Sequence, residues 1–196
     1  MTTAKKILIS SGGWQGSLAT MQSLGRLGHH PYLLANNQET PAIHSKYCKG
    51  FFITPRVEQE KEYLSCLIQI LSENKFDGFI PISDQVVSLI SRHRAQLLNM
   101  TKFILPDEKT VDLTVNKTNT YHFCLQNNIP IPETYFPQSW ADILEISKKN
   151  IFPCFIKYPM GSAGNNNMFV ERPNQLIEFF KSKERTEIWK MANFYC

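Results

Sequence analysis

The chain has 196 residues, enough for one large domain or two small ones. With 42% hydrophobic and 19% charged residues, its composition is that of a globular protein and excludes an intrinsically disordered one. The net charge of +4 is modest, and the Lys and Arg residues are scattered, which argues against a dedicated nucleic-acid-binding surface.

Short apolar runs alternate with helical patterns through residues 1–105. Apolar side chains recur at helical spacing from Leu18 until Gly28, and helices are also expected at 58–74 and 84–98. The expected strands are 6–10, 31–35, 51–54, 78–82 and 102–105. Strands that alternate with helices predict βαβ units and a parallel sheet covered on both faces. The first domain is therefore expected to be α/β and Rossmann-like.

The pattern changes after Pro106. Two short helical patterns occupy 107–128, and "NNIPIPETYFP" (127–137) breaks them with three prolines, as an interdomain connection would. The remaining segments are expected to be a helix at 139–149, strands at 152–158 and 168–171, and a helix at 173–183. Because the two strands flank one short loop, they predict an antiparallel hairpin.

The five cysteines are widely spaced and form no C-x-x-C pair. We expect reduced, mostly buried thiols in a cytoplasmic protein, not a disulfide framework or a zinc site. No apolar run approaches the roughly 20 residues that a membrane span needs, and only Ile7–Ile9 follow Lys5 and Lys6. We therefore expect neither a signal peptide nor a membrane partner.

The hairpin loop lies within "KYPMGSAGNNNM" (157–168). Glycines allow backbone N–H groups to converge on an anion, but Gly and Asn also fill ordinary hairpin turns. Lys157 ends the apolar run "CFIK". A lysine in a buried strand requires a counter-charge, whereas alternation along the strand would simply point it into solvent. Spacing alone leaves both interpretations open.

A second glycine-containing turn, "SSGGWQGS" (10–17), joins the first strand to the first helix. It has the position of a Rossmann phosphate loop but not the G-x-G-x-x-G pattern, and Asn36 and Asn37 stand where an acid would hold a ribose. A dinucleotide site is therefore disfavoured. A tight turn is the preferred interpretation, and a weaker role for Ser11, Gly12 and Gly13 in holding a substrate carboxylate stays open.

Ser83 and Asp84 in "PISDQ" follow the carboxyl end of another predicted strand. Open α/β sheets bind ligands at such edges, so both are weak candidates for substrate binding. Asp84 would also make a good N-cap for the following helix, which by itself could explain it. Arg92, His93 and Arg94 are interpreted as a solvated helix face.

The chain resembles the N-terminal part of an ATP-grasp ligase. In the first domain the resemblance rests on "SLGRLGHHPYLL", "TPAIHSKYC" and "IPISDQVVSLISRHRAQL". In the second it rests on "NKTNTYHFCLQNNIPIPETY" followed by "FPCFIKYPMGSAG". The group concerned comprises carboxylate–amine ligases and predicted ATP-dependent carboligases related to carbamoyl-phosphate synthase and D-aspartate ligase.

The resemblance implies an ATP-dependent carbon–nitrogen ligase that acts through an acyl-phosphate. It implies that Lys117 is the first ATP lysine and that Lys157, on a lid strand, reaches the α- and β-phosphates. The loop residues implied to cover the β- and γ-phosphates are Gly161, Ser162, Ala163 and Gly164. The chain departs from the family at Tyr158, where proline is usual, and at Asn165 to Asn167, where small residues are common.

The same resemblance implies three parts: a pre-ATP-grasp domain (1–105), a helical linker (106–130) and an incomplete α+β lid domain (131–196). In the family the Mg²⁺ ligands and the arginine that steadies the acyl-phosphate follow the lid. We therefore expect no metal ligands in these 196 residues and little ATP turnover, and the catalytic residues stay unknown. We also expect Phe123, Ile156 and Phe169 to be partly exposed, which would favour self-association, for instance as a homodimer.

The expected partners are ATP and a small carboxylate or amino-acid substrate. One alternative is a non-catalytic small-acid or nucleotide-binding module with a degenerate ATP-grasp fold. Another is a nucleotide-sugar or NAD(P)-binding enzyme, which Gly12, Gly13 and Gly16 would suggest and which the missing acid after the second strand opposes.

Overall fold

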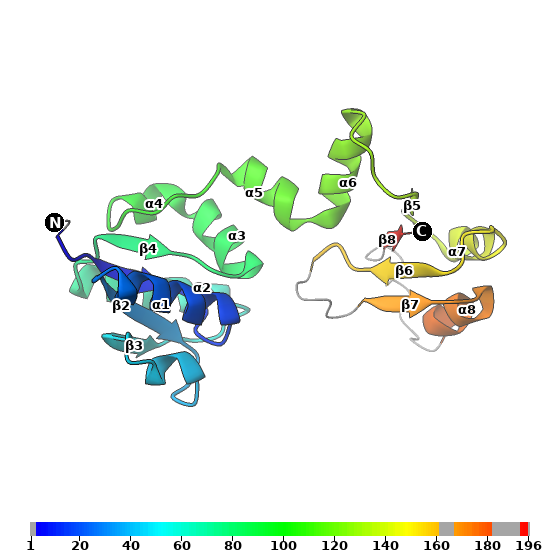
Figure 1. Cartoon of the computed structure of the whole chain (residues 1–196). Helices are drawn as coiled ribbons and strands as arrows, with labels where there is room; N and C mark the ends of the chain where they lie inside the picture. Colours follow the sequence, from blue (N-terminus) through cyan, green and yellow to red (C-terminus); the bar gives the residue numbers. More distant parts are fainter. Residues whose placement is uncertain (1–2, 161–166, 182–192, 196) are drawn as a thin grey trace. The chain divides into compact units, whose positions relative to one another are not determined.

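The computed structural model describes residues 3–160, 167–181 and 193–195 (Figure 1). Its contacts divide the chain into two compact units, Met1–Val111 and Asp112–Cys196. The segment 106–130, expected as a connection, is thus divided between the two units. Each unit is described below by itself.

The first unit is built on a four-stranded parallel sheet with the strand order β3-β2-β1-β4. Its elements in chain order are β1 (Lys6–Ile9), α1 (Gln15–Arg26), β2 (His30–Ala35), η1 (Pro41–His44), β3 (Gly50–Ile53), α2 (Glu60–Glu73), β4 (Gly78–Ile80), α3 (Asp84–Arg92), α4 (Arg94–Leu98) and α5 (Glu108–Val115), whose last residues belong to the second unit. The expected α/β class and parallel sheet are confirmed.

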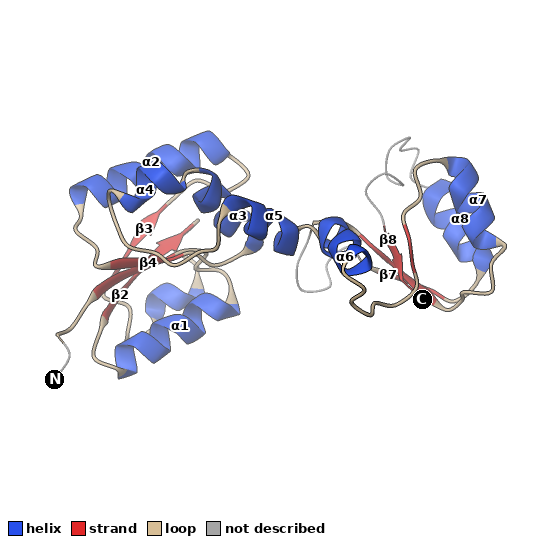
Figure 2. Ribbon diagram, turned by 90° about the horizontal axis from the view of Figure 1, so that it is seen from above, coloured by secondary structure: helices blue, strands red, loops and turns tan. Residues whose placement is uncertain are grey.

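Alternation along the central strand β1 gives the sheet two apolar faces. Leu8 packs into a core with residues of α2, α3 and α4, including Leu67 and Leu89. Ile9 belongs to a smaller core that includes Met21 of α1. Figure 2 shows α1 on one side of the sheet and α2 and α4 on the other. The carboxyl edge of the sheet is left for the loops that carry the candidate site.

Two predicted elements of this unit differ from the structure. The helix expected at 84–98 is broken at His93, whose backbone (φ −105°, ψ 20°) leaves the helical region between α3 and α4. The strand expected at 102–105 does not form. Phe79 N donates to the carbonyl of Lys102, and the carbonyls of Leu105 and Pro106 accept from the guanidinium of Arg94.

The second unit contains a sheet with the order β5-β8-β6-β7. Its further elements are α6 (Lys117–Gln126), β5 (Thr134–Tyr135), α7 (Trp140–Ser147), β6 (Cys154–Lys157), β7 (Met168–Val170), α8 (Pro173–Lys181) and β8 (Asn193–Tyr195). The antiparallel pairing of β6 and β7 confirms the predicted hairpin. The short strands β5 and β8 were not predicted, because runs of two and three residues show no alternation.

One face of this second sheet packs against α7 and α8 (Figure 2). Ile156 is fully buried in that core, so the expectation that it would be exposed is wrong. Phe155 and Phe169 are 44% and 49% exposed and lie side by side, with ring centroids 4.9 Å apart. Phe123 of α6 is 42% exposed, as expected.

Of the four cysteines within the described ranges, only Cys154 is buried, whereas Cys48, Cys66 and Cys124 are partly exposed. The expectation of mostly buried thiols is therefore wrong. Across the part of the chain that the structure describes, the helices are too short or too polar to cross a membrane.

Candidate functional site

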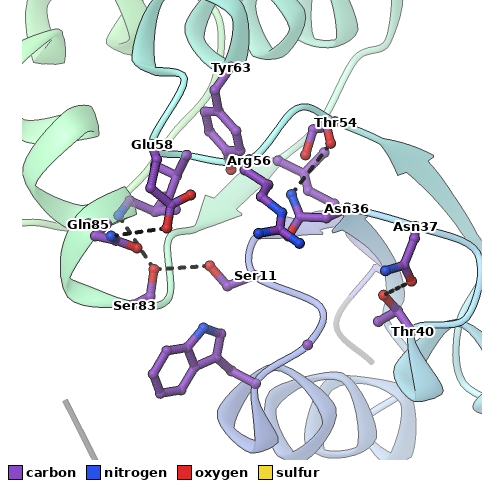
Figure 3. A pocket seen from close by; sticks show the side chains of 15 residues that line it. Ser11, Asn36, Asn37, Thr40, Thr54, Arg56, Glu58, Tyr63, Ser83 and Gln85 are labelled. Atoms are coloured by element: carbon purple, nitrogen blue, oxygen red, sulfur yellow. Dashed lines mark hydrogen bonds between the residues drawn. The ribbon is translucent and has the colours of Figure 1, made fainter. Parts of the chain in front are cut away.

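A cavity of about 360 Å³ lies at the carboxyl edge of the first unit's sheet (Figure 3). Its walls come from the segments that follow the four strands and from the starts of the helices behind them. Because β1 lies between β2 and β4, the chain reverses its direction across the sheet at β1. Open α/β sheets bind their ligands at such a switch point. The position is therefore that of a small-molecule site.

Ser11 and Ser83 connect the ends of β1 and β4 at this cavity. Their hydroxyl oxygens lie 3.1 Å apart, and the Ser11 hydroxyl donates to the carbonyl of Ile82 at 2.6 Å. Because that bond uses the only hydroxyl proton of Ser11, Ser83 is the donor between the two serines. Both hydroxyl protons are thus donated to acceptors within the protein. The serines fix the two loops and offer a ligand only acceptor positions.

Both serines have a positive φ, 57° at Ser11 and 74° at Ser83. Such a backbone costs about 1–3 kcal/mol for a residue other than glycine and clusters at ligand sites. The turn at Ser83 lets its hydroxyl oxygen accept from Val86 N, so Ser83 is the N-cap of α3. Asp84 is the first residue of that helix, so the interpretation of Asp84 as the N-cap is wrong. Asp84 is not among the residues that line the cavity.

The two glycines of the first turn have different surroundings. A Cβ at Gly12 would lie 2.8 Å from Leu33 Cδ2 and 3.0 Å from the carbonyl oxygen of Leu34. Gly12 N also donates to that carbonyl at 2.9 Å, so Gly12 allows the turn to approach β2. Gly13 lines the cavity, and a Cβ there would meet nothing within 4 Å. Of the predicted residues, Ser11, Gly13 and Ser83 line the cavity, whereas Gly12 and Asp84 do not.

Among the described residues that line the cavity, Arg56 is basic and Glu58 is acidic. Glu58 Oε1 accepts from the Gln85 amide at 3.3 Å, which orients the carboxylate (Figure 3). Within the described part of the chain, the guanidinium of Arg56 makes no salt bridge, and the two charges do not pair with each other. Asn36 donates to the carbonyl of Pro55 at 3.0 Å, which holds the segment that carries Arg56.

Tyr63 supplies a buried polar atom at the same cavity. The residue is 3% exposed, its ring belongs to the larger core, and its hydroxyl has no hydrogen-bond partner among the described residues. Burial raises the pKa of Tyr63, so the hydroxyl stays protonated and can donate. Figure 3 shows this hydroxyl pointing toward the side chains of Arg56 and Glu58.

The sequence interpretation did not include Arg56, Glu58 or Tyr63. The signal that could have found Arg56 and Glu58 is the one used for Ser83, because they follow the third strand, whose carboxyl end shares the same edge. Tyr63 lies among the apolar residues of α2, where an aromatic residue reads as core.

Lys157 ends β6 in the second unit. Cys154 and Ile156 are buried in the core, whereas Phe155 is exposed and Lys157 is half-buried. Alternation therefore places Lys157 with Phe155 on the face of the sheet opposite α7 and α8. The lysine stem can lie along this surface while its ammonium group stays away from the core.

Lys117 is the first residue of α6, and its backbone N donates to the carbonyl of Pro159 at 2.9 Å. The side chain of Asn116 caps the helix, accepting from Thr118 N at 3.0 Å and from Asn119 N at 3.4 Å. The start of α6 therefore lies beside the chain that leaves β6, close in sequence to Lys157. The structure brings together the two regions predicted to contact ATP.

The remaining predicted residues, Gly161, Ser162, Ala163 and Gly164, lie outside the described residues. In the described ranges 3–160, 167–181 and 193–195, no group of three or more His, Cys, Asp or Glu side chains is placed to hold a metal ion.

No family model matches the chain. It is 20% identical over 181 residues to a formate-dependent phosphoribosylglycinamide formyltransferase of Ignicoccus hospitalis. The aligned residues cover 92% of this chain and 42% of that protein. The structure is similar to an L-amino acid ligase from Bacillus licheniformis (TM-score 0.71, 17% identity, 100% of this chain and 44% of that one). It is also similar to an N5-carboxyaminoimidazole synthetase from Staphylococcus aureus complexed with ADP (TM-score 0.69, 17% identity, 100% and 48%).

The chain spans less than half the length of each of these proteins. All three are ATP-grasp enzymes, as the sequence resemblance predicts. The likeness extends over the whole chain and includes both of its units. The chain therefore has the fold of the N-terminal part of the ATP-grasp ligases.

Proposed function

We propose that this chain is the N-terminal part of an ATP-dependent carboxylate–amine ligase. In this proposal the second unit holds nucleotide phosphates and the first unit holds a small acid. The observation that carries the proposal is the hydrogen bond from Lys117 N to the carbonyl of Pro159, which joins the helix of one predicted ATP lysine to the segment that follows the strand of the other. The fold shared with ATP-grasp enzymes supports it.

The chemistry of the described residues fits a nucleotide polyphosphate. When bound, ATP supplies the phosphoryl group that activates a carboxylate as an acyl-phosphate. The ammonium groups of Lys117 and Lys157 offset the phosphate charge, and such charge-assisted contacts are the strong class of hydrogen bond. Asn116 and the bond to Pro159 fix the start of α6 and so limit the positions open to Lys117. The described residues offer no set of Mg²⁺ ligands, so we assign no step to the metal.

The experiment is a calorimetric titration of ADP into the protein, compared with its Lys117→Met and Lys157→Met variants. Methionine keeps the apolar stem and removes only the charge. We expect each substitution to weaken ADP binding about 10- to 100-fold. Lys148→Met is the matched control, because Lys148 is an exposed lysine of the same unit, at the end of α7, whose one salt bridge among the described residues is with Glu145. Equal affinity in all four proteins would reject the assignment.

A second candidate is a non-catalytic module that binds a small acid. The observation in its favour is that the described residues that line the cavity all belong to the first unit, Met1–Val111. This candidate predicts binding of the acid with no binding of ADP, so the same titration separates the two.

A further inference from the structure

The charged groups at the cavity of the first unit are arranged for a ligand with two opposite charges. Arg56 and Glu58 both line it, and they form no salt bridge with each other. The bond from Gln85 holds the Glu58 carboxylate, which therefore keeps three acceptor positions for another donor. A cation and an anion that lie at one cavity and form no salt bridge with any described residue leave room for a molecule that pairs with both.

The buried hydroxyl of Tyr63 is the second, independent observation. A polar atom removed from water without a partner costs about 1–3 kcal/mol, so native proteins keep few of them. This one belongs to a residue that is 3% exposed and that lines the same cavity. As a donor it matches an oxygen acceptor of the ligand, and it points toward the side chain of Arg56 (Figure 3).

We propose that the cavity binds a zwitterionic α-amino acid, with Arg56 and the Tyr63 hydroxyl on its carboxylate and Glu58 on its ammonium group. Gln85 is a positioning residue that orients Glu58. The hydroxyl protons of Ser11 and Ser83 are donated to acceptors within the protein, so these serines shape the site and do not donate to the carboxylate. The volume of about 360 Å³ leaves space for the amino-acid side chain.

The lining charges discriminate against simpler ligands. A phosphate ester carries close to two negative charges and would meet Glu58 as well as Arg56, so repulsion offsets much of its attraction. A plain carboxylic acid would satisfy Arg56 and Tyr63 but leave Glu58 without its counter-charge. An amine alone would leave Arg56 and the buried hydroxyl without theirs. Only the zwitterion uses all three groups.

The test is a calorimetric titration of the 196-residue protein with each common L-amino acid, without nucleotide. The tightest ligand is then compared with its des-amino acid and with its carboxamide. We expect both analogues to bind at least about tenfold more weakly, as the loss of one charged contact implies. No amino-acid binding at up to about 10 mM, or equal binding of the des-amino acid, would overturn the proposal.

Three variants assign the contacts. Glu58→Gln should weaken binding of the amino acid about tenfold and leave binding of the des-amino acid unchanged. Arg56→Gln should weaken the binding of both ligands. Tyr63→Phe should weaken the binding of both ligands. It should not lower the melting temperature, because the hydroxyl has no hydrogen-bond partner among the described residues. Arg26→Gln, at an exposed arginine of α1 outside the cavity, is the control and should change neither. An unchanged affinity in Glu58→Gln would contradict the ammonium contact.

As a statement about the substrate of a ligase, the inference rests on the proposed function. The two fail separately, because amino-acid binding is measured without nucleotide. Amino-acid binding without ADP binding would reject the proposed ligase function and support the proposed amino-acid site. ADP binding that depends on the lysines, without amino-acid binding, would reject the site and keep the nucleotide assignment.

Discussion

The backbone N–H of Lys117 donates to the carbonyl oxygen of Pro159 across 2.9 Å. This bond connects the first turn of α6 to the chain that follows β6, although the two residues are distant in sequence. Because Lys157 ends β6, the contact places both predicted ATP lysines in one region of the second unit. The position of Lys117 therefore depends on the local structure that holds the start of α6.

The first prediction concerns the cap of that helix. Asn116→Ala removes the acceptor for Thr118 N and Asn119 N and should destabilise α6 by about 1 kcal/mol. Hydrogen exchange of the α6 amides should become about fivefold faster, whereas α7, with its own cap at Ser139, should be unchanged. Asn116→Asp keeps an acceptor and should behave like the wild type. If the α6 amides exchanged at the same rate in Asn116→Ala as in the wild type, the stabilising role of the Asn116 cap would be contradicted.

The second prediction concerns the positive φ of 74° at Ser83. Ser83→Ala and Ser83→Gly both lose the capping hydroxyl, but only glycine adopts this backbone without strain. The glycine variant should therefore be more stable than the alanine variant by about 1–3 kcal/mol in urea unfolding. At Ser88, within α3, the order should reverse, because glycine in a helix costs about 0.5–1 kcal/mol relative to alanine. The same order at both positions would be inconsistent with the strained turn.

The third prediction compares the neighbouring glycines of the first turn. Gly12→Ala places a Cβ 2.8 Å from a side-chain carbon of Leu33 and 3.0 Å from the carbonyl oxygen of Leu34. It should destabilise the first unit by about 1–3 kcal/mol, as overpacking does. Gly13→Ala meets open space and should change stability by less than about 0.5 kcal/mol. The free energies of unfolding of both variants are measured by chemical denaturation. Similar losses of stability in the two variants would contradict the described turn.

The fourth prediction is a pH dependence in the second unit. Asp142 Oδ2 accepts from the backbone N–H groups of Gln138 and Ser139 at 2.7 and 2.9 Å. The Gln138 bond, followed by the Ser139 bonds, holds the pKa of Asp142 below its ordinary value of 3.8. A carboxylate with a lowered pKa stabilises the folded state above its unfolded pKa, and this contribution disappears as the pH falls through the folded pKa.

Asp142→Asn should therefore lower the melting temperature at pH near 7, and the difference from the wild type should shrink below about pH 4. Glu145→Gln is the control, because among the described residues the Glu145 side chain pairs with Lys148 at the surface and takes no part in the N-terminal cap of α7. A difference between wild type and Asp142→Asn that is constant from neutral to acidic pH would rule out this capping carboxylate.

The sequence predicted the sheet of the first unit because alternating faces leave a clear apolar pattern, as at Leu8 and Ile9. It did not predict the break at His93, because Arg92 to Ala95 read as a continuous helix and the break appears only in the backbone of the folded unit. Nor did it predict that the guanidinium of Arg94 would donate to the carbonyls of Leu105 and Pro106, since such contacts depend on tertiary structure.

For the candidate site, the sequence located the edge of the sheet but not the chemistry of the cavity. Ser83 was recognised from its position after a strand, yet its role as the N-cap depends on a φ that the sequence does not reveal. Tyr63 looks like any core aromatic in the sequence. It is marked as part of the site only by its buried hydroxyl, which has no hydrogen-bond partner in the part of the chain that the structure describes.

The most direct test of the nucleotide assignment is a titration of the ¹⁵N-labelled protein with ADP, followed through its backbone amide signals. The account predicts that signals of residues 116–118 and 155–158 shift together along one binding curve, and that Lys157→Met moves this curve about 10- to 100-fold toward higher ADP concentration. No shift at these residues at up to about 10 mM ADP, or shifts confined to the first unit, would contradict it.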